Sequence, residues 1–156
     1  LDAAFVCSAT IPCPAEMGGS IHIFGTGSSI IDTVFVCRIH GVVRRSHLFG
    51  TPAELIGIVK SELQQLHLAG MKPTLGDIRC IVYGHLTRIA VWNLRKSWDT
   101  SLPTAQRLEL FTKMIFSIGD PQKIIDSFGA VPKQATARVA ESRSTYGKEE
   151  QSAISF

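Results

Sequence analysis

The sequence predicts an α/β fold in which a β-hairpin precedes three to four α-helices. Between residues 5 and 38, apolar residues recur with a period of two on either side of a loop rich in Gly and Ser. From Thr51 the period changes to about 3.6 residues, which is the helical repeat. The order of the two patterns places the strands first and the helices after them.

Composition limits the class of protein. At 156 residues, 45% hydrophobic and 19% charged, the chain can bury a core of ordinary size, as one domain or as a half-domain with a small one. Its net charge of +3 favours weak association with polyanions without requiring it. Charged residues such as Arg38 and Lys60 interrupt every apolar stretch before the roughly 20 residues that cross a bilayer. We therefore expect no membrane span.

The cysteines show no spacing typical of a metal or disulfide site. Cys7, Cys13, Cys37 and Cys80 form no C-x-x-C pair and have no Cys or His neighbour at zinc-ligand spacing. We expect reduced, mostly buried thiols that behave as small hydrophobic groups. Such thiols fit a cytoplasmic protein, where disulfides rarely persist.

The first strand is expected at Phe5–Ile11, where apolar and small polar residues alternate. One face of this strand is predicted to be better buried, and it carries Phe5, Cys7, Ala9 and Ile11. Pro12 and Pro14 are expected to end the strand near a sheet edge, because neither can donate to a ladder.

The second strand, expected at Ile30–Arg38, is apolar on both faces. One face carries Ile31, Phe35 and Cys37, and the other carries Ile30, Val34 and Val36. Such a strand is typical of the interior of a sheet that is covered on both sides. We predict that it pairs antiparallel with the first strand, with the loop from Pro14 to Ser29 folded over one end.

Capping signals delimit the helices. The first is predicted between Thr51 and Gly70, with Pro52 in its first turn and Glu54 as its capping acid. A second begins near Thr74 with Asp77 completing its cap and runs to about Lys96. A third follows the break at SWDTSLPT and is marked by Leu108, Phe111, Met114, Ile115 and Ile118. A short fourth helix opens at Asp120 and Pro121, and residues 130–156 are expected to form a flexible tail.

The loop at Gly25–Ser29 offers backbone N–H groups together with the hydroxyls of Thr26, Ser28 and Ser29. Such a loop can hold a phosphate, but a strand rather than a helix follows it, so it matches neither nucleotide-binding loop motif. It is either a structural turn or a contact with DNA phosphate or a target base. Ser20 and His22 share these alternatives.

Two further groups of residues have a structural and a functional interpretation. Glu16 is either structural or a contact with DNA or a base pocket, since no partner for acid–base catalysis lies near it in sequence. Arg88, Trp92 and Arg95 share one face of the second helix, with His85 adjacent. This stripe either contacts phosphates and bases or packs within the protein as a cation–π surface. Arg44, Arg45 and His47 are further candidates for phosphate contact.

The run from Thr10 to Arg38 resembles the last two strands of adenine-specific, amino-group DNA methyltransferases, which use S-adenosylmethionine. The residues that carry the resemblance are Pro14, Ala15, Glu16, Met17, Ser20, His22, Ile23, Gly25–Ser29 and the strand IIDTVFVCR. In that fold the final strand is antiparallel inside the sheet, and its hairpin partner lies at the edge. The same asymmetry between the two strands is predicted from their apolar patterns.

The resemblance implies that this chain is the C-terminal part of such an enzyme. Residues 1–40 would be the last catalytic-domain strands, 41–50 a connector, 51–129 a helical extension and 130–156 the tail. The chain begins at Leu1 in mid-pattern, so we expect the upstream part of the same polypeptide as its partner, with DNA as substrate. The resemblance also implies a cytoplasmic enzyme, either a lone methylase or part of a restriction-modification or defence system.

The family's chemistry does not map onto this chain. Its amine-holding Asn/Asp-Pro-Pro-Tyr motif and its donor-binding Gly-rich turn have no counterpart here. We therefore assign no catalytic, cofactor-binding or metal-binding residue, and expect S-adenosylmethionine to bind only the full-length protein. The target base is flipped into a pocket bordered by strand-end loops, so the candidate contacts are Glu16, Ser20, His22, Thr26, Ser28, Ser29, Arg88, Trp92 and Arg95. The alternative is a noncatalytic helical module that binds nucleic acid or protein.

Overall fold

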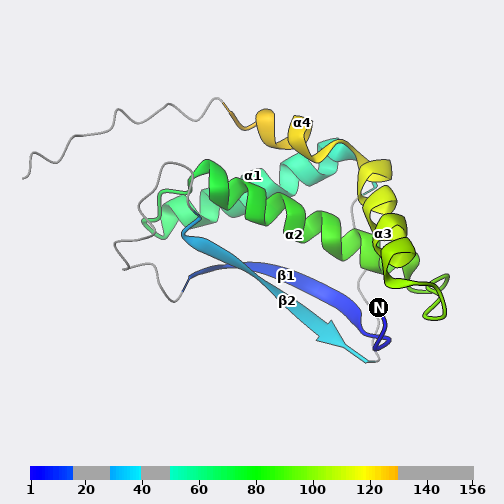
Figure 1. Ribbon diagram of the computed structural model, residues 1–156. Helices are drawn as coiled ribbons and strands as arrows, with labels where there is room; N and C mark the ends of the chain where they lie inside the picture. Colours follow the sequence, from blue (N-terminus) through cyan, green and yellow to red (C-terminus); the bar gives the residue numbers. More distant parts are fainter. Residues whose placement is uncertain (16–28, 40–49, 130–156) are drawn as a thin grey trace, which may run out of the picture.

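The computed structural model describes residues 1–15, 29–39 and 50–129, which form a two-stranded antiparallel sheet followed by four helices (Figure 1). The elements are β1 (Val6–Pro14), β2 (Ile31–Arg38), α1 (Pro52–Leu68), α2 (Leu75–Leu94), α3 (Thr104–Ile118) and α4 (Pro121–Asp126). The predicted order of a hairpin and then helices is confirmed. Residues 130–156, predicted to be a tail, lie outside the described residues.

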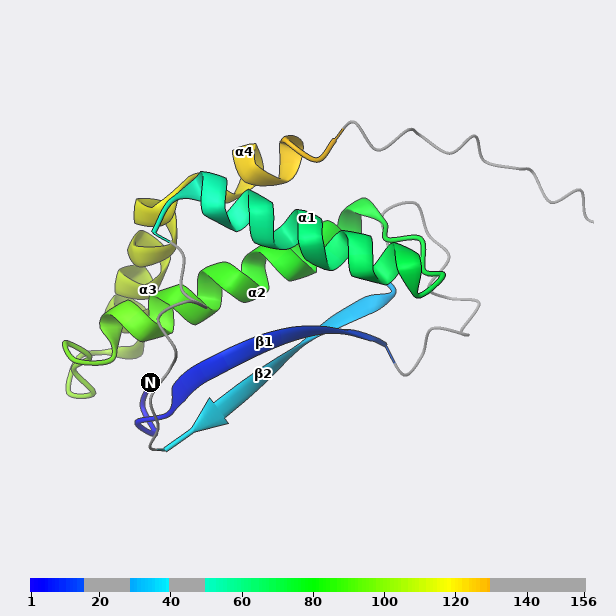
Figure 2. The same ribbon diagram turned by 180° about the vertical axis from the view of Figure 1, so that it is seen from behind.

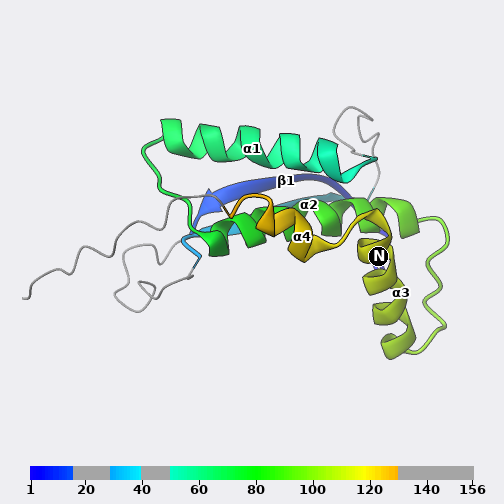
Figure 3. The same ribbon diagram turned by 90° about the horizontal axis from the view of Figure 1, so that it is seen from above.

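Helix α2 is the centre of the fold, and it contacts every other element. The hairpin lies along one side of α2, and α1 runs beside it (Figures 1 and 2). Seen from above, α4 lies over α2, while α3 crosses near one end and projects away from the other helices (Figure 3). This arrangement leaves α3 without a single buried residue.

Strand and helices share one hydrophobic core. Ile31 of β2 is fully buried in the same cluster as side chains from α1, α2 and α4. The other members are Leu55, Val59, Leu66, Ile78, Ile81, Val82, Leu86, Ile89, Ile124, Ile125 and Phe128. Full burial of such a side chain contributes roughly 1.5 to 3 kcal/mol, so the helices stabilise the hairpin directly.

The two strands pair antiparallel as predicted, but β1 does not alternate as expected. A β-bulge interrupts the register between Cys7, which pairs with Cys37, and Ala9, which pairs with Val36. The extra residue turns Thr10 toward the helices, so Cys7 and Thr10 are both buried. Ile11, predicted to share a face with Cys7, is 46% exposed on the opposite face.

The prediction that Pro12 and Pro14 end β1 was wrong for Pro12, which lies inside the strand, whereas Pro14 is its last residue. The N–H of Ala15 donates to the carbonyl of Ile30 at 3.0 Å. Successive residues point their N–H groups to opposite sides of an antiparallel strand. The nitrogens of Pro12 and Pro14 therefore face away from β2, where a missing donor leaves no ladder bond unmade.

The capping predictions for the helices are confirmed. The Thr51 hydroxyl accepts from the N–H of Glu54 at 3.3 Å, and Gly70 follows α1 with a φ of 81°. Thr74 and Asp77 form a capping box at the start of α2. Asp120 caps α4, with Pro121 in its first turn. Among the described residues no helix combines the length and the apolar character needed to cross a membrane.

The prediction that the cysteines are mostly buried was wrong in part. All four are free thiols, but only Cys7 is buried. Cys13 and Cys80 are half-buried, and Cys37 is exposed.

The carboxylate of Asp77 joins the start of β2 to the start of α2. Its Oδ1 accepts from the N–H groups of Ile30 at 2.6 Å and Ile31 at 2.9 Å, and lies 2.8 Å from the Ser29 hydroxyl. Its Oδ2 accepts from the N–H of Thr74 at 2.6 Å. Asp77 is fully buried, and so is its hydrogen bond to Ile31, while its hydrogen bonds to Ile30 and Thr74 are partly buried.

We predict that Asp77→Ala lowers the free energy of unfolding by about 3 kcal/mol, because the buried N–H of Ile31 and the partly buried N–H groups of Ile30 and Thr74 lose their carboxylate acceptor. Chemical denaturation of the purified chain measures the change. Asp32→Ala, at an exposed site on β2, is the matched control and should change stability by less than about 0.5 kcal/mol. Equal effects of the two substitutions would contradict this account of Asp77.

A second prediction uses two helical glycines. A Cβ at Gly84 of α2 would lie 2.6 Å from Cγ2 of Thr33, whereas a Cβ at Gly57 of α1 would meet nothing within 4 Å. Gly84→Ala should therefore destabilise the protein by about 1 to 3 kcal/mol through overpacking against β2. Gly57→Ala should stabilise it by up to about 1 kcal/mol, since alanine is the better helix former. Thermal unfolding distinguishes these opposite signs.

Candidate functional site

The loop residues predicted to contact DNA or a target base lie mainly outside the described residues. This holds for Glu16, Ser20, His22, Thr26 and Ser28. It holds also for the connector residues Arg44, Arg45 and His47.

Ser29 is the described member of the loop set, and its hydroxyl has a structural environment. It lies 2.8 Å from Asp77 Oδ1 and 2.6 Å from the carbonyl of Ile31. The Cys80 thiol also donates to it at 3.3 Å. These contacts account for Ser29 as part of the junction between β2 and α2, which is the structural alternative for this residue.

A buried polar array joins the hairpin to both long helices. The Thr10 hydroxyl of β1 lies 3.3 Å from His85 Nδ1 of α2, and His85 Nε2 lies 2.9 Å from Glu62 Oε2 of α1. The His85 side chain is 5% exposed and that of Glu62 is 19% exposed. Threonine, histidine and carboxylate in this order hold the imidazole in one orientation, so the array fixes how three elements meet.

A small cavity of about 310 Å³ opens beside this array, between β1 and α1. Its walls are polar near Thr10 and Glu62 and apolar near Ile11 and Leu66. The array therefore borders a hollow large enough for a few solvent molecules.

The candidate DNA-contacting stripe on α2 divides into a buried and a half-buried part. Arg88 is only 6% exposed, and its Nε and Nη2 atoms have no hydrogen-bond partner among the described residues. Burial lowers the pKa of Arg88, while Cys7 and Glu62 raise it. As folded, this guanidinium faces the hairpin side of α2 rather than a solvent-accessible phosphate.

Trp92 and Arg95 form the half-buried part of the stripe. The guanidinium carbon of Arg95 lies 3.5 Å from the centre of the Trp92 ring, and the same side chain donates to the Trp92 carbonyl. This is a cation–π pair within one helix, as the structural alternative predicted. Both side chains retain partial solvent exposure, so stacking on a nucleic acid base is sterically open to them.

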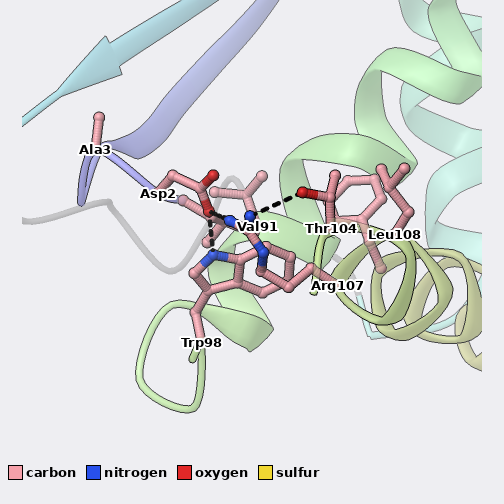
Figure 4. A pocket seen from close by; sticks show the side chains of 9 residues that line it. Asp2, Ala3, Val91, Trp98, Thr104, Arg107 and Leu108 are labelled. Atoms are coloured by element: carbon pink, nitrogen blue, oxygen red, sulfur yellow. Dashed lines mark hydrogen bonds and ion pairs between the residues drawn. The ribbon is translucent and has the colours of Figure 1, made fainter. Parts of the chain in front are cut away.

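A second, larger pocket of about 490 Å³ lies where the N-terminal segment meets the end of α2 and the start of α3 (Figure 4). Its apolar wall is formed by Leu1, Ala3, Val91, Trp98, Leu108 and Phe111. The Asp2 carboxylate bridges Arg107 and the Trp98 indole N–H, the latter at 2.8 Å. The hydrogen bonds from Arg107 and Trp98 hold the pKa of Asp2 below its usual value.

Two cysteines meet at the bulged end of the hairpin. Cys7 and Cys37 are direct partners across the strands, and Arg88 of α2 lies close enough to act on Cys7 electrostatically. Burial and the neighbouring Cys37 raise the pKa of the Cys7 thiol to about 11, although the Arg88 charge opposes this. Among the described residues, no three His, Cys, Asp or Glu side chains gather as metal ligands.

Sequence reasoning missed Thr10, Glu62, Asp2 and Arg107 as members of these sites. Each gains its partner from a different element, so no local spacing signals the contact. Thr10 and Ser8 are the polar residues in the alternating pattern of the first strand, and that pattern does not distinguish the buried Thr10 from the half-buried Ser8. The pairing of Cys7 with Cys37 could have been found from the register of the hairpin, had the bulge at Ser8 been anticipated.

No protein-family model, no curated protein and no solved structure matches this chain.

The burial of Arg88 gives a prediction about stability. Replacing a buried, incompletely paired charge by an apolar side chain of similar volume is often neutral or stabilising. We expect Arg88→Met to retain the fold and raise the free energy of unfolding by about 1 to 3 kcal/mol. The control is Arg79→Met at an exposed position of the same helix, with an effect below about 0.5 kcal/mol. A large loss of stability for Arg88→Met, measured by urea denaturation, would contradict the prediction.

Proposed function

We propose that this chain is the C-terminal part of an adenine-specific, amino-group DNA methyltransferase, and that it supplies the last hairpin of the catalytic sheet with the helices that cover it. S-adenosylmethionine and the reacting amine are held by segments outside this chain. The chain itself contributes structure and the surface that borders the DNA.

The observation that carries the proposal concerns the hairpin. It has apolar residues on both faces, but the helices cover only one of them. The inner face packs on α2 through residues such as Ile31 and Thr33. On the outer face Ile11 is 46% and Val34 is 45% exposed, and they are direct partners across the strands. Ala9, Cys13 and Val36 extend this face.

A sheet of the methyltransferase type has helices on both faces, which explains apolar residues on both sides of its last strands. The antiparallel pairing of β1 and β2 agrees with the hairpin that ends such a sheet. The prolines of β1 place their nitrogens on its outer edge, as an edge strand allows. These features support the resemblance seen in the sequence between Thr10 and Arg38.

Within the proposed enzyme, α2 has a structural role: it positions β2 and takes no part in the methyl transfer itself. Asp77 fixes the first residues of β2, directly after the loop predicted to border the flipped base. Among the described residues, the half-buried Trp92 and Arg95 are then the candidates for contact with DNA. Contacts of this kind set the register of a protein on the duplex.

The alternative is a noncatalytic module that binds nucleic acid or protein. The apolar pocket beside Trp98 favours it, because a concave apolar surface with a polar rim is a common binding feature. The two functions differ in what the complete reading frame encodes.

The decisive experiment is to express the complete reading frame and to measure transfer of a labelled methyl group from S-adenosylmethionine to DNA. The methyltransferase proposal requires an upstream Gly-rich turn and an Asn/Asp-Pro-Pro-Tyr motif, with label recovered as N6-methyladenine. Replacing the Asn or Asp of that motif by Ala is the control and should abolish transfer. DNA binding without any methyl transfer would favour the noncatalytic module.

For the chain alone, we predict no saturable binding of S-adenosylmethionine at micromolar concentrations and no methylation of DNA, because the donor-binding and amine-holding motifs are absent. Isothermal titration calorimetry with the purified chain measures donor binding. Micromolar affinity would show that the donor site lies in this chain.

We also predict that the isolated chain self-associates through the outer face of the hairpin, since exposed apolar strands with free edges recruit other chains. Val34→Lys should shift the chain toward the monomer in light scattering at high concentration. Leu68→Lys, at a side chain 81% exposed on α1, is the control and should leave association unchanged. A wild-type chain that stays monomeric would contradict the prediction.

A further inference from the structure

The Cys7–Cys37 pair is placed for chemistry that the proposed function does not use. Residues directly opposite in an antiparallel pair have Cβ atoms about 4.5 to 5.5 Å apart, only slightly more than a disulfide requires. Cys7 and Cys37 are such partners, next to the bulge at Ser8. The other two thiols are placed differently, since Cys13 is opposite Asp32 and Cys80 donates to Ser29.

The two thiols differ in solvent exposure, and this difference determines which of them reacts first. Cys37 is exposed, so a soluble oxidant can reach it, while Cys7 is 3% exposed and meets only its immediate neighbours. Arg88 lies beside Cys7 and has two buried N–H donors without a partner among the described residues. A thiolate at Cys7 would gain a nearby positive charge and available hydrogen-bond donors.

We propose that Cys7 and Cys37 form a redox-active pair. Cys37 reacts first with a low-molecular-weight disulfide to give a mixed disulfide, and Cys7 then converts this mixed disulfide into a cross-strand disulfide. Arg88 is the positioning residue for the Cys7 thiolate. This inference is independent of the methyltransferase proposal.

The reaction balances with glutathione disulfide as the oxidant. The Cys37 thiolate attacks one sulfur of glutathione disulfide, which forms a mixed disulfide and releases one glutathione thiolate. The Cys7 thiolate then attacks the Cys37 sulfur, which forms the Cys7–Cys37 bond and releases the second glutathione thiolate. Two protein thiols are oxidised and lose their protons, and glutathione disulfide is reduced to two molecules of glutathione.

The test uses the reduced full chain incubated with glutathione disulfide, then alkylated and mapped by mass spectrometry. We expect one intramolecular disulfide between Cys7 and Cys37, with Cys13 and Cys80 alkylated. Cys7→Ser should stop at the mixed disulfide on Cys37, and Cys37→Ser should yield no bridge to Cys7. The double variant Cys13→Ser, Cys80→Ser is the matched control and should form the bridge at the wild-type rate.

Two results would overturn the pair. One is a wild-type chain that stops at the mixed disulfide, and the other is a bridge mapped to a different pair of cysteines. The Cys7→Ser and Cys37→Ser variants must retain the helical circular dichroism of the wild type, which the small change at a strand position allows. If either does not, Cys7→Ala and Cys37→Ala replace them.

The role of Arg88 has its own readout, the pH dependence of the resolving step. Below the pKa of Cys7 the thiolate fraction, and with it the rate, rises about tenfold for each pH unit. Loss of the nearby positive charge in Arg88→Met should slow resolution at fixed pH by about threefold or more, and higher pH should restore the rate. Arg79→Met should leave the profile unchanged. A profile for Arg88→Met that matches the wild type would overturn the role of Arg88.

Discussion

The fold depends on the buried carboxylate of Asp77. One side chain closes the first turn of α2 through Thr74 and also accepts from the backbone of Ile30 and Ile31. A negative charge at a helix N-terminus is favoured by the helix dipole, and the fully buried Asp77 carboxylate also accepts from several N–H donors. The direction of α2 and the starting point of β2 are thus fixed by the same group.

From that junction, α2 and β2 run side by side and meet again at Gly84. The absence of a side chain there lets Thr33 approach the helix, where its hydroxyl donates to the Cys80 carbonyl at 2.9 Å. Farther along, the array of Thr10, His85 and Glu62 connects β1, α2 and α1. A small hairpin is held on its helix by polar contacts at intervals, with the apolar core between them.

The features predicted from sequence are those that local chemistry determines. Thr51, Thr74 and Asp120 act as caps within their own first turns, so their roles could be predicted without the fold. The bulge at Ser8 was missed because the position of an extra residue depends on how the strand packs against β2 and α2, and the local sequence does not show this. The partners of Asp77 at β2 were missed for the same reason, since its capping role is local but its contacts with Ile30 and Ile31 are not.

The bulge at Ser8 also explains why the candidate sites lie where they do. By turning both Cys7 and Thr10 toward the helices, it places a thiol beside Arg88 and a hydroxyl beside His85 on the same helix. Without it, alternation would put one of these two side chains on the outer face with Ile11 and Val34. The hairpin would then lose either the contact of Cys7 with Arg88 or that of Thr10 with His85. One inserted residue therefore keeps Cys7 and Thr10 together on the inner face, which contacts the helices. Ile11 and Val34 stay on the outer face, which is open to a partner.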